Sequence, residues 1–275
     1  MQGPIVNSHR LTRVLAITGG KGGIGKTNIA INLSVALAGM SQKVMLLDAD
    51  MGLANIDVML GIKAKNTICD VLVGKCKLED VIVQGPNNIR IIPSSSGNMQ
   101  MASLGYVEIS GLINTFSQID EMPNYLLIDT AAGITECVVG FAAAADEVII
   151  IICNEPTSIA DAYALIKLLN KQFNIHKFRV ITNKMRKIGE SGEVFAKLTR
   201  VTDKFLNVSM TLIGSIPEDR FMEKAIRKAK SIITEYPYSM GAKAFHDIAR
   251  NVMNLPTSQI VTGNMQFFQQ QLVEG

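Results

Sequence analysis

Short apolar segments alternate with longer amphipathic segments along most of this chain. The short ones have the length and composition of buried strands and lie at 14–18, 43–47, 89–92, 125–128, 148–153, 178–182 and 210–214. The longer ones carry apolar residues at helical spacing and lie at 28–38, 107–119, 159–173, 190–205, 220–230 and 241–253. This alternation predicts an α/β fold class: a single doubly wound, mostly parallel sheet with helices on both faces.

The same pattern sets the expected domain boundaries. We expect an N-terminal extension at 1–13, one domain at 14–253, and a tail at 254–275 that begins with a hinge around Pro256. Within the tail, Met265, Phe268 and Leu272 fall on one stripe of a predicted amphipathic C-terminal helix at 264–273.

A glycine-rich loop directly follows the first predicted strand. Residues 19–27 read G-G-K-G-G-I-G-K-T, which fills the P-loop pattern and opens the helix at 28–38. Strand, loop and helix agree, so a chance glycine-rich turn is disfavoured. The residues expected to hold the nucleotide here are Gly20, Lys21, Gly22, Gly23, Ile24, Gly25, Lys26, Thr27 and Asn28. Backbone N–H groups would surround the phosphates, Lys26 would reach the β- and γ-phosphates, and the Thr27 hydroxyl would ligate Mg²⁺.

Carboxylates follow two of the other predicted strands. Asp48 and Asp50 end the second strand on one face, and Asp129 ends the strand at 125–128, with Gly133 four residues later. The carboxyl ends of parallel strands meet at one edge of the sheet, beside the P-loop. An apolar strand ending in Asp129 is the Walker B arrangement, in which the carboxylate holds Mg²⁺ directly or through water.

Composition excludes several classes of partner and site. The apolar share of 48% is ample for a core, and the net charge of +3 provides no bulk field for nucleic acid or an anionic membrane. Direct nucleic-acid binding is therefore not expected, and the basic residues at 220–230 are more typical of a solvated face. The four cysteines form no C-x-x-C pair, which argues for buried free thiols at most of these positions. No apolar run suits a signal peptide or a membrane span, so we expect a cytoplasmic protein.

Lys21 indicates the class of P-loop. A lysine just after the first loop glycines resembles the deviant Walker motif of the MinD/ParA ATPases, and the resemblance extends from Val14 to at least Met253. It implies a slow ATPase, ATP or ADP and Mg²⁺ as ligands, and an ATP-dependent homodimer in which Lys21 reaches the partner's nucleotide. The resemblance assigns catalytic roles to Lys21, Lys26 and Asp50. Of these, Asp50 would position or activate the attacking water.

The resemblance implies further site residues. Asp48 matches the second-sphere magnesium aspartate of the family, Thr27 and Asp129 complete the metal site, and Asp129 with Gly133 matches the second switch. The segments that hold adenine in the family match Asn183, Pro217, Glu218 and Asp219.

Two sequence strings, at 48–60 and 154–167, look most like the flagellar-number regulators of the FlhG/FleN type. Such proteins restrain a σ54-type flagellar transcription activator and act opposite the flagellar GTPase FlhF. Residues 1–13 lack the D-Q-A-x-x-L-R motif with which some members stimulate that GTPase. The family also ends in a membrane-binding helix, so the resemblance implies peripheral attachment to the inner face of the cytoplasmic membrane in the ATP state.

The tail and the function both keep alternatives. No Lys or Arg occurs after Arg250, so the predicted helix lacks electrostatic attraction to anionic lipid. It could instead dock on a groove of its own body or of a partner. A MinD- or ParA-like positioning or DNA-segregation ATPase is the alternative function. A cluster carrier is disfavoured by the missing C-x-x-C pair, and a module that binds a transcription factor with vestigial hydrolysis stays open.

Overall fold

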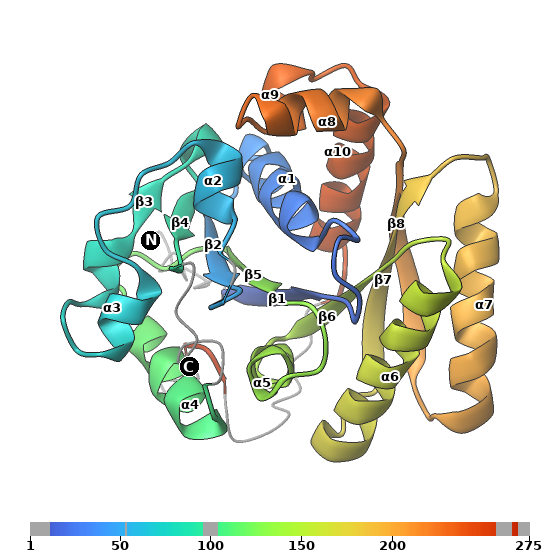
Figure 1. Ribbon diagram of the computed structural model, residues 1–275, viewed down its shortest axis with the longest axis horizontal. Helices are drawn as coiled ribbons and strands as arrows, with labels where there is room; N and C mark the ends of the chain where they lie inside the picture. Colours follow the sequence, from blue (N-terminus) through green and yellow to red (C-terminus); the bar gives the residue numbers. More distant parts are fainter. Residues whose placement is uncertain (1–11, 53, 96–103, 257–265, 269–275) are drawn as a thin grey trace, which may run out of the picture.

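The computed structural model describes residues 12–52, 54–95, 104–256 and 266–268, and one eight-stranded sheet forms its centre (Figure 1). The strand order is β3-β4-β2-β5-β1-β6-β7-β8. The strands are β1 Arg13–Thr18, β2 Val44–Ala49, β3 Val83–Gln84, β4 Arg90–Ile92, β5 Tyr125–Thr130, β6 Glu147–Ile152, β7 Lys177–Met185 and β8 Ser209–Pro217. Every pairing is parallel except that of β3 with β4, which confirms the predicted mostly parallel sheet.

Helices follow most of the strands. The α-helices are α1 Lys26–Gly39, α2 Ile56–Leu60, α3 Ile68–Leu72, α4 Tyr106–Thr115, α5 Glu136–Ala143, α6 Pro156–Phe173, α7 Glu190–Phe205, α8 Arg220–Arg227, α9 Ile232–Glu235 and α10 Met240–Met253. Short 3-10 turns occur at η1 Leu78–Val81, η2 Pro86–Asn88 and η4 Phe116–Gln118. In the described part of the chain, no helix combines the length and apolar character needed to cross a membrane.

The two faces of the sheet are covered by different helices, as predicted. On one face of β1, Leu15 and Ile17 pack in a core with α1 and α10. On the opposite face, Val14 packs in a core with α4 and α5, and Ala16 packs in a core with α6 and α7 (Figure 1). This alternation along one strand follows from the two-residue period of side chains. Both faces of β1 are buried, so its carboxyl end is held rigidly where the P-loop begins.

Three short or fully buried elements were not predicted. They are α5, α9 and the two-residue edge strand β3. The predicted strands at 178–182 and 210–214 both end too early, because β7 and β8 continue to Met185 and Pro217. The expected free thiols are confirmed: Cys69, Cys137 and Cys153 are buried.

A buried ionic cluster ties several elements together at the edge where β1 and β6 begin. Glu147 is 4% exposed and accepts from Arg13 at 2.8 Å and from Arg179 at 2.8 Å. The Arg13 guanidinium also donates to the carbonyls of Val252, Leu255 and Pro256 at 3.0–3.2 Å. Arg13 therefore fixes the start of the predicted hinge against the sheet.

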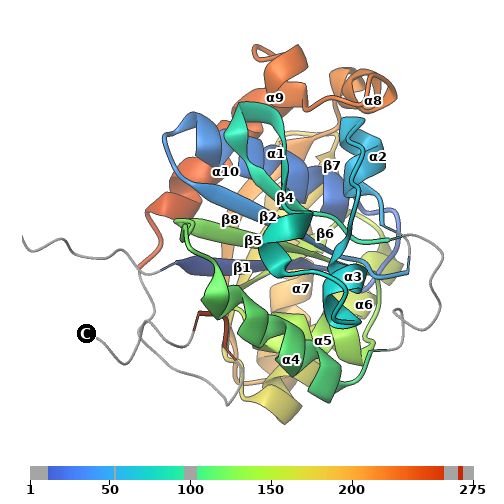
Figure 2. The same cartoon turned by 90° about the vertical axis from the view of Figure 1, so that its left-hand side faces the viewer.

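The described part of the tail lies in the core beside α4 and α5. Phe267 and Phe268 are 6% and 4% exposed. Phe267 makes an edge-to-face contact with Phe116 at 5.0 Å between centroids and stacks on Phe141 at 6.4 Å. Figure 2 shows this red segment next to α4. The tail thus contacts the body of its own chain, as in the docking alternative.

The predicted tail helix is not continuous through this segment. Residues 267–268 form a turn, and Phe268 has a φ of 59°, which a right-handed helix does not allow. The other residues of the predicted helix, including Met265 and Leu272, lie outside the described residues, as does the N-terminal extension up to residue 11.

Candidate nucleotide and magnesium site

The P-loop connects the carboxyl end of β1 to the first turn of α1. Gly23 and Gly25 have φ values of 75° and 94°, a left-handed conformation that favours glycine. Gly25 is the N-cap of α1 and offers no side chain to the helix N–H groups. These N–H groups and the helix dipole suit an anion, so the structure places the predicted phosphate cradle as expected.

Side chains from β7 hold the loop from outside. Asn183 Nδ2 donates to the carbonyl of Ile24 at 2.7 Å, and Lys184 Nζ donates to that of Gly23 at 2.9 Å. A Cβ on Gly25 would lie 2.5 Å from Asn183 Nδ2. These contacts hold the loop against the end of β7.

Helix α6 approaches the same loop closely. A Cβ on Gly20 would lie 2.5 Å from Cβ of Asp161 and 2.7 Å from its backbone carbonyl. Only glycine fits at this distance without a shift of α6. The loop and the first turns of α6 therefore pack as one unit.

Asp48 and Asp129 lie opposite one another on adjacent strands. They are register partners in β2 and β5, and each is 1% exposed. Asp48 accepts from the N–H groups of Asp50, Asn55 and Ile56 at 3.1–3.2 Å. Asp48 therefore also shapes the segment that carries Asp50.

Asp129 keeps one oxygen free of protein donors. The Thr27 side chain hydrogen-bonds to this carboxylate, while Oδ1 of Asp129 is buried and finds no hydrogen-bond partner among the described residues. A buried unsatisfied oxygen is costly in a folded protein. The structure thus brings Thr27, Asp48 and Asp129 together, as the sequence predicts for the metal site.

Burial sets the electrostatics of these groups. It raises the pKa of Asp48 to about 7, and burial together with the charge of Asp48 raises the pKa of Asp129 well above its ordinary range. Burial also lowers the pKa of Lys26, against the opposing charges of Asp129 and Asp50. The site carries excess negative charge that a bound cation would neutralise.

The donors fit Mg²⁺. They are carboxylate and hydroxyl oxygens, the ligands of a hard cation. No group of three or more His, Cys, Asp or Glu side chains capable of holding a metal occurs in the described ranges. Mg²⁺ sites commonly combine one or two protein ligands with substrate phosphates, so Thr27 and Asp129 would hold the ion together with the nucleotide.

The raised pKa of Asp129 leads to a stability prediction. Asp129→Asn should raise the free energy of unfolding of the nucleotide-free protein at pH 8 by about 1–2 kcal/mol, because it removes a buried charge. A raised pKa means that the folded state binds a proton more tightly, so the cost of this carboxyl grows with pH. The gain should therefore be smaller at pH 5, as measured by urea denaturation at both pH values.

The control for this prediction is Asp203→Asn on the exposed face of α7. It should change the stability little at either pH. If Asp129→Asn is no more stable than wild type at pH 8, burial and the charge of Asp48 do not destabilise the Asp129 carboxylate. ATP turnover should be lost in Asp129→Asn, because this change removes a predicted ligand of Mg²⁺.

Lys21 contacts the start of α6. Its ammonium forms an ion pair with Glu155 and donates to Thr157 Oγ1 at 3.1 Å. Its carbonyl accepts from Lys26 Nζ at 3.5 Å. The hydrogen bond from Lys21 lowers the pKa of Glu155, and Glu155 in turn raises that of Lys21.

The predicted adenine segments lie at the ends of β7 and β8, next to the loop. Pro217 pairs with Met185 in the sheet. Glu218 binds Arg186 at 2.8 Å, and Asp219 caps α8 by accepting from Phe221 N at 2.8 Å. The side chains of Glu218 and Asp219 thus shape the turn. Their contact with adenine, like that of Asn183, stays a prediction.

Several residues around the site were missed. Lys184, Glu155, Thr157 and Asp161 contact the loop, yet the sequence analysis gave them no role. Lys184 follows Asn183 directly, and that adjacency was an available signal. For the contact of Asp161 with Gly20, the sequence provided none, because it depends on how α6 packs.

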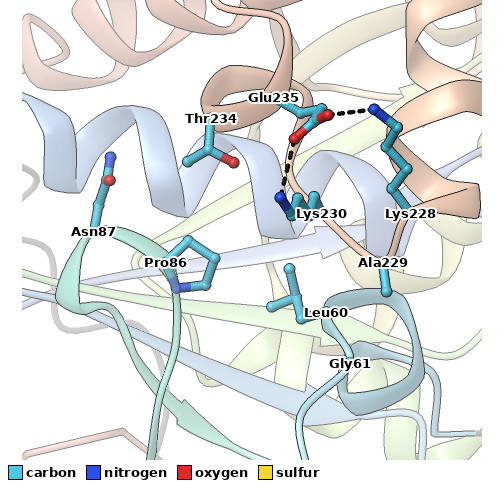
Figure 3. Close-up of a pocket in the computed structure, with 9 residues that line it drawn as sticks. All are labelled: Leu60, Gly61, Pro86, Asn87, Lys228, Ala229, Lys230, Thr234 and Glu235. Atoms are coloured by element: carbon cyan, nitrogen blue, oxygen red, sulfur yellow. Dashed lines mark hydrogen bonds and ion pairs between the residues drawn. The ribbon is translucent and has the colours of Figure 1, made fainter.

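A separate pocket lies away from these residues. It measures about 540 Å³ and is lined by α2, η2 and the segment from α8 to α9. Figure 3 shows Lys228 and Lys230 both bound to Glu235 at its rim. The five basic residues at 220–230 are all exposed, in line with a solvated face.

Comparison with known proteins identifies the family. Residues 12–182 match the family described as AAA domain. FleN of Pseudomonas aeruginosa, an antiactivator, is 46% identical over 98% of this chain and 96% of its own length. YlxH of Helicobacter pylori, a flagellum site-determining protein, is 31% identical over 93% of this chain and 85% of its own.

Solved structures of MinD proteins have a similar fold. MinD from Pyrococcus horikoshii, complexed with Mg-ADP, is 28% identical and covers 91% of this chain and all of its own, with a TM-score of 0.72. The MinC:MinD complex from Aquifex aeolicus is 25% identical, covers 93% of this chain and all of its own, and has a TM-score of 0.73. With the loop, the paired carboxylates and Lys21 in place, the chain belongs to the MinD/ParA family of P-loop ATPases and uses ATP and Mg²⁺.

Proposed function

We propose that this ATPase is a dimerising switch, in which ATP closes two protomers on two nucleotides and hydrolysis reopens them. The observation that carries the proposal is the placement of Lys21. Its ammonium contacts α6 at the exposed side of the P-loop and leaves its own phosphate site to Lys26. An exposed cation at the rim of a nucleotide site is suited to a nucleotide held by a second protomer.

We propose the following roles within the closed dimer, as the family resemblance implies. Lys26 and the loop N–H groups bind the phosphates, Asp50 orients the attacking water, and Lys21 adds positive charge from the partner. Mg²⁺, when bound, supplies further charge to the phosphate oxygens. Phosphoryl transfer needs positioning and electrostatic stabilisation above all, and these groups provide both.

Sedimentation velocity tests the dimer. With ATP and the Asp50→Ala variant, which slows hydrolysis, we expect a stable dimer. Adding Lys21→Ala should return the protein to the monomer, while ADP should leave every variant monomeric. A dimer that forms regardless of nucleotide and of Lys21 would overturn the proposal.

The names of the relatives support a flagellar role for the switch. FleN is an antiactivator and YlxH a flagellum site-determining protein. We infer that the ATP-bound dimer restrains a σ54-type flagellar transcription activator and so limits flagellar number. Pull-down from a flagellated host with an ATP analogue or ADP should recover such an activator only in the ATP-like state.

The same pull-down has informative alternatives. Recovery of the flagellar GTPase FlhF would identify it as a further partner. Recovery of a division or partition protein without any activator would favour a MinD- or ParA-like positioning role and contradict the flagellar proposal.

The tail is the proposed membrane contact. Phe267 and Phe268 are buried against Phe116 and Phe141 in this protomer, so membrane binding requires that they leave the core. Each buried phenylalanine contributes about 1.5–3 kcal/mol, so release must be offset by lipid or dimer contacts.

Vesicle sedimentation tests this tail. Binding should need the ATP analogue and should fall in the Phe267→Ser, Phe268→Ser double variant. Neutral and anionic vesicles should bind alike, because residues 251–275 contain no Lys or Arg. Binding that depends on anionic lipid would point to another surface.

A further inference from the structure

Glu155 and Thr157 form a fixed acceptor site for Lys21 at the start of α6. Glu155 is the N-cap residue of that helix, and Thr157 lies in its first turn. Ser158 Oγ accepts from the N–H of Cys153 at 3.1 Å, and α6 packs directly on Gly20. The backbone that carries the two acceptors is therefore held in place by contacts within the protomer.

The contact occupies the lysine that the dimer would need. Lys21 binds both acceptors in its own protomer, and one ammonium cannot keep this geometry while reaching a nucleotide across an interface. From this geometry we infer that Glu155 and Thr157 act as an intramolecular latch on Lys21 that opposes ATP-dependent dimerisation. The inference rests on the proposed dimer, whose closure it would regulate. Glu155 is a positioning residue here, since it acts through Lys21.

The size of the effect follows from a population argument. Both partners are partly exposed, so the pair is screened by solvent and its bias toward the latched state is modest, about two- to fivefold. A dimer must release two lysines, one in each protomer, so the penalty enters the dimerisation constant squared. With this bias, about one-third to one-sixth of the protomers have Lys21 released, so removing the latch should tighten the dimer by about nine- to 36-fold.

Sedimentation velocity over a concentration series with a non-hydrolysable ATP analogue measures this constant. Glu155→Gln should lower the dimer dissociation constant by the stated factor. Thr157→Val, which removes only the hydroxyl acceptor, should change it in the same direction by less. Glu193→Gln, an equal loss of charge on the exposed first turn of α7, is the matched control and should leave it unchanged.

Three dependences of the dimer affinity, on salt, on ADP and on Lys21, distinguish the latch from a purely structural role of Glu155. The gain in Glu155→Gln should shrink at high salt, because the wild-type pair is screened there. The gain in dimer affinity should be absent with ADP. It should also be absent when Glu155→Gln is combined with Lys21→Ala in a double variant, because the effect passes through Lys21. Thermal midpoints of wild type and Glu155→Gln should agree.

The outcomes separate the latch from the dimer itself. If wild type dimerises and Lys21→Ala does not, but Glu155→Gln matches Glu193→Gln or weakens the dimer, the latch alone is overturned. If wild type stays monomeric with the analogue, or Lys21→Ala dimerises like wild type, the proposed switch is overturned as well.

Discussion

Asp50→Ala should lower ATP turnover by about 100- to 1,000-fold while the protein still binds ATP. Asp50 follows β2 and is held next to the site by the bond from its N–H to Asp48. Its charge also acts on Lys26, which places it near the phosphate end of the loop. Loss of the carboxylate removes the group that we propose to orient the attacking water, but it leaves the predicted phosphate cradle intact. Steady-state phosphate release measures the loss of turnover, and a separate ATP-binding measurement checks that binding is retained.

A neighbouring carboxylate provides the control. Asp57 on α2 belongs to the segment that follows Asp50, and it accepts from the N–H of Val58 within its own helix. Asp57→Ala should retain turnover close to that of wild type. Turnover within about threefold of wild type in Asp50→Ala would contradict the role of Asp50 in orienting water.

Glu147→Ala should reduce the free energy of unfolding by about 3–5 kcal/mol, because it leaves two largely buried guanidinium groups without their common carboxylate. Arg13 and Arg179 are each 11% exposed and cannot regain full hydration in the folded protein. Chemical denaturation of the nucleotide-free protein measures this loss.

Conservative and functional controls refine the test of Glu147. Glu147→Gln keeps the shape and part of the hydrogen bonding, so its loss should be smaller. The cluster lies at the start of the strands and the P-loop at their ends, so the KM for ATP should stay near that of wild type below the unfolding transition. A loss under about 1 kcal/mol in Glu147→Ala would show that the pairings contribute little.

The residues predicted for the nucleotide site lie together in the structure, because local chemistry determines where they fall along the chain. The loop glycines, Lys26, Thr27 and the carboxylates at the strand ends each have a short-range signal, and the parallel sheet brings them to one edge. The contacts around them depend on tertiary packing. The partner of Lys21 lies 134 residues away in the chain, and no pattern indicates it.

Secondary elements were missed where no periodic signal exists. In α5, residues 137–142 are all buried, so the helix has no polar face to reveal its period. Strand β3 has only two residues and α9 only four, both too short for a window of residues to detect. The tail was predicted as a helix from its apolar stripe, but the two phenylalanines instead occupy the core beside α4 and α5.

The close approach of α6 to Gly20 should restrict which residues position 20 can carry in members of the family. A side chain at this position would collide with the backbone of Asp161 unless the helix moved outward. Movement of α6 would in turn carry Glu155 and Thr157 away from Lys21. Substitution at position 20 should therefore be inherited only together with compensating changes in the first turns of α6.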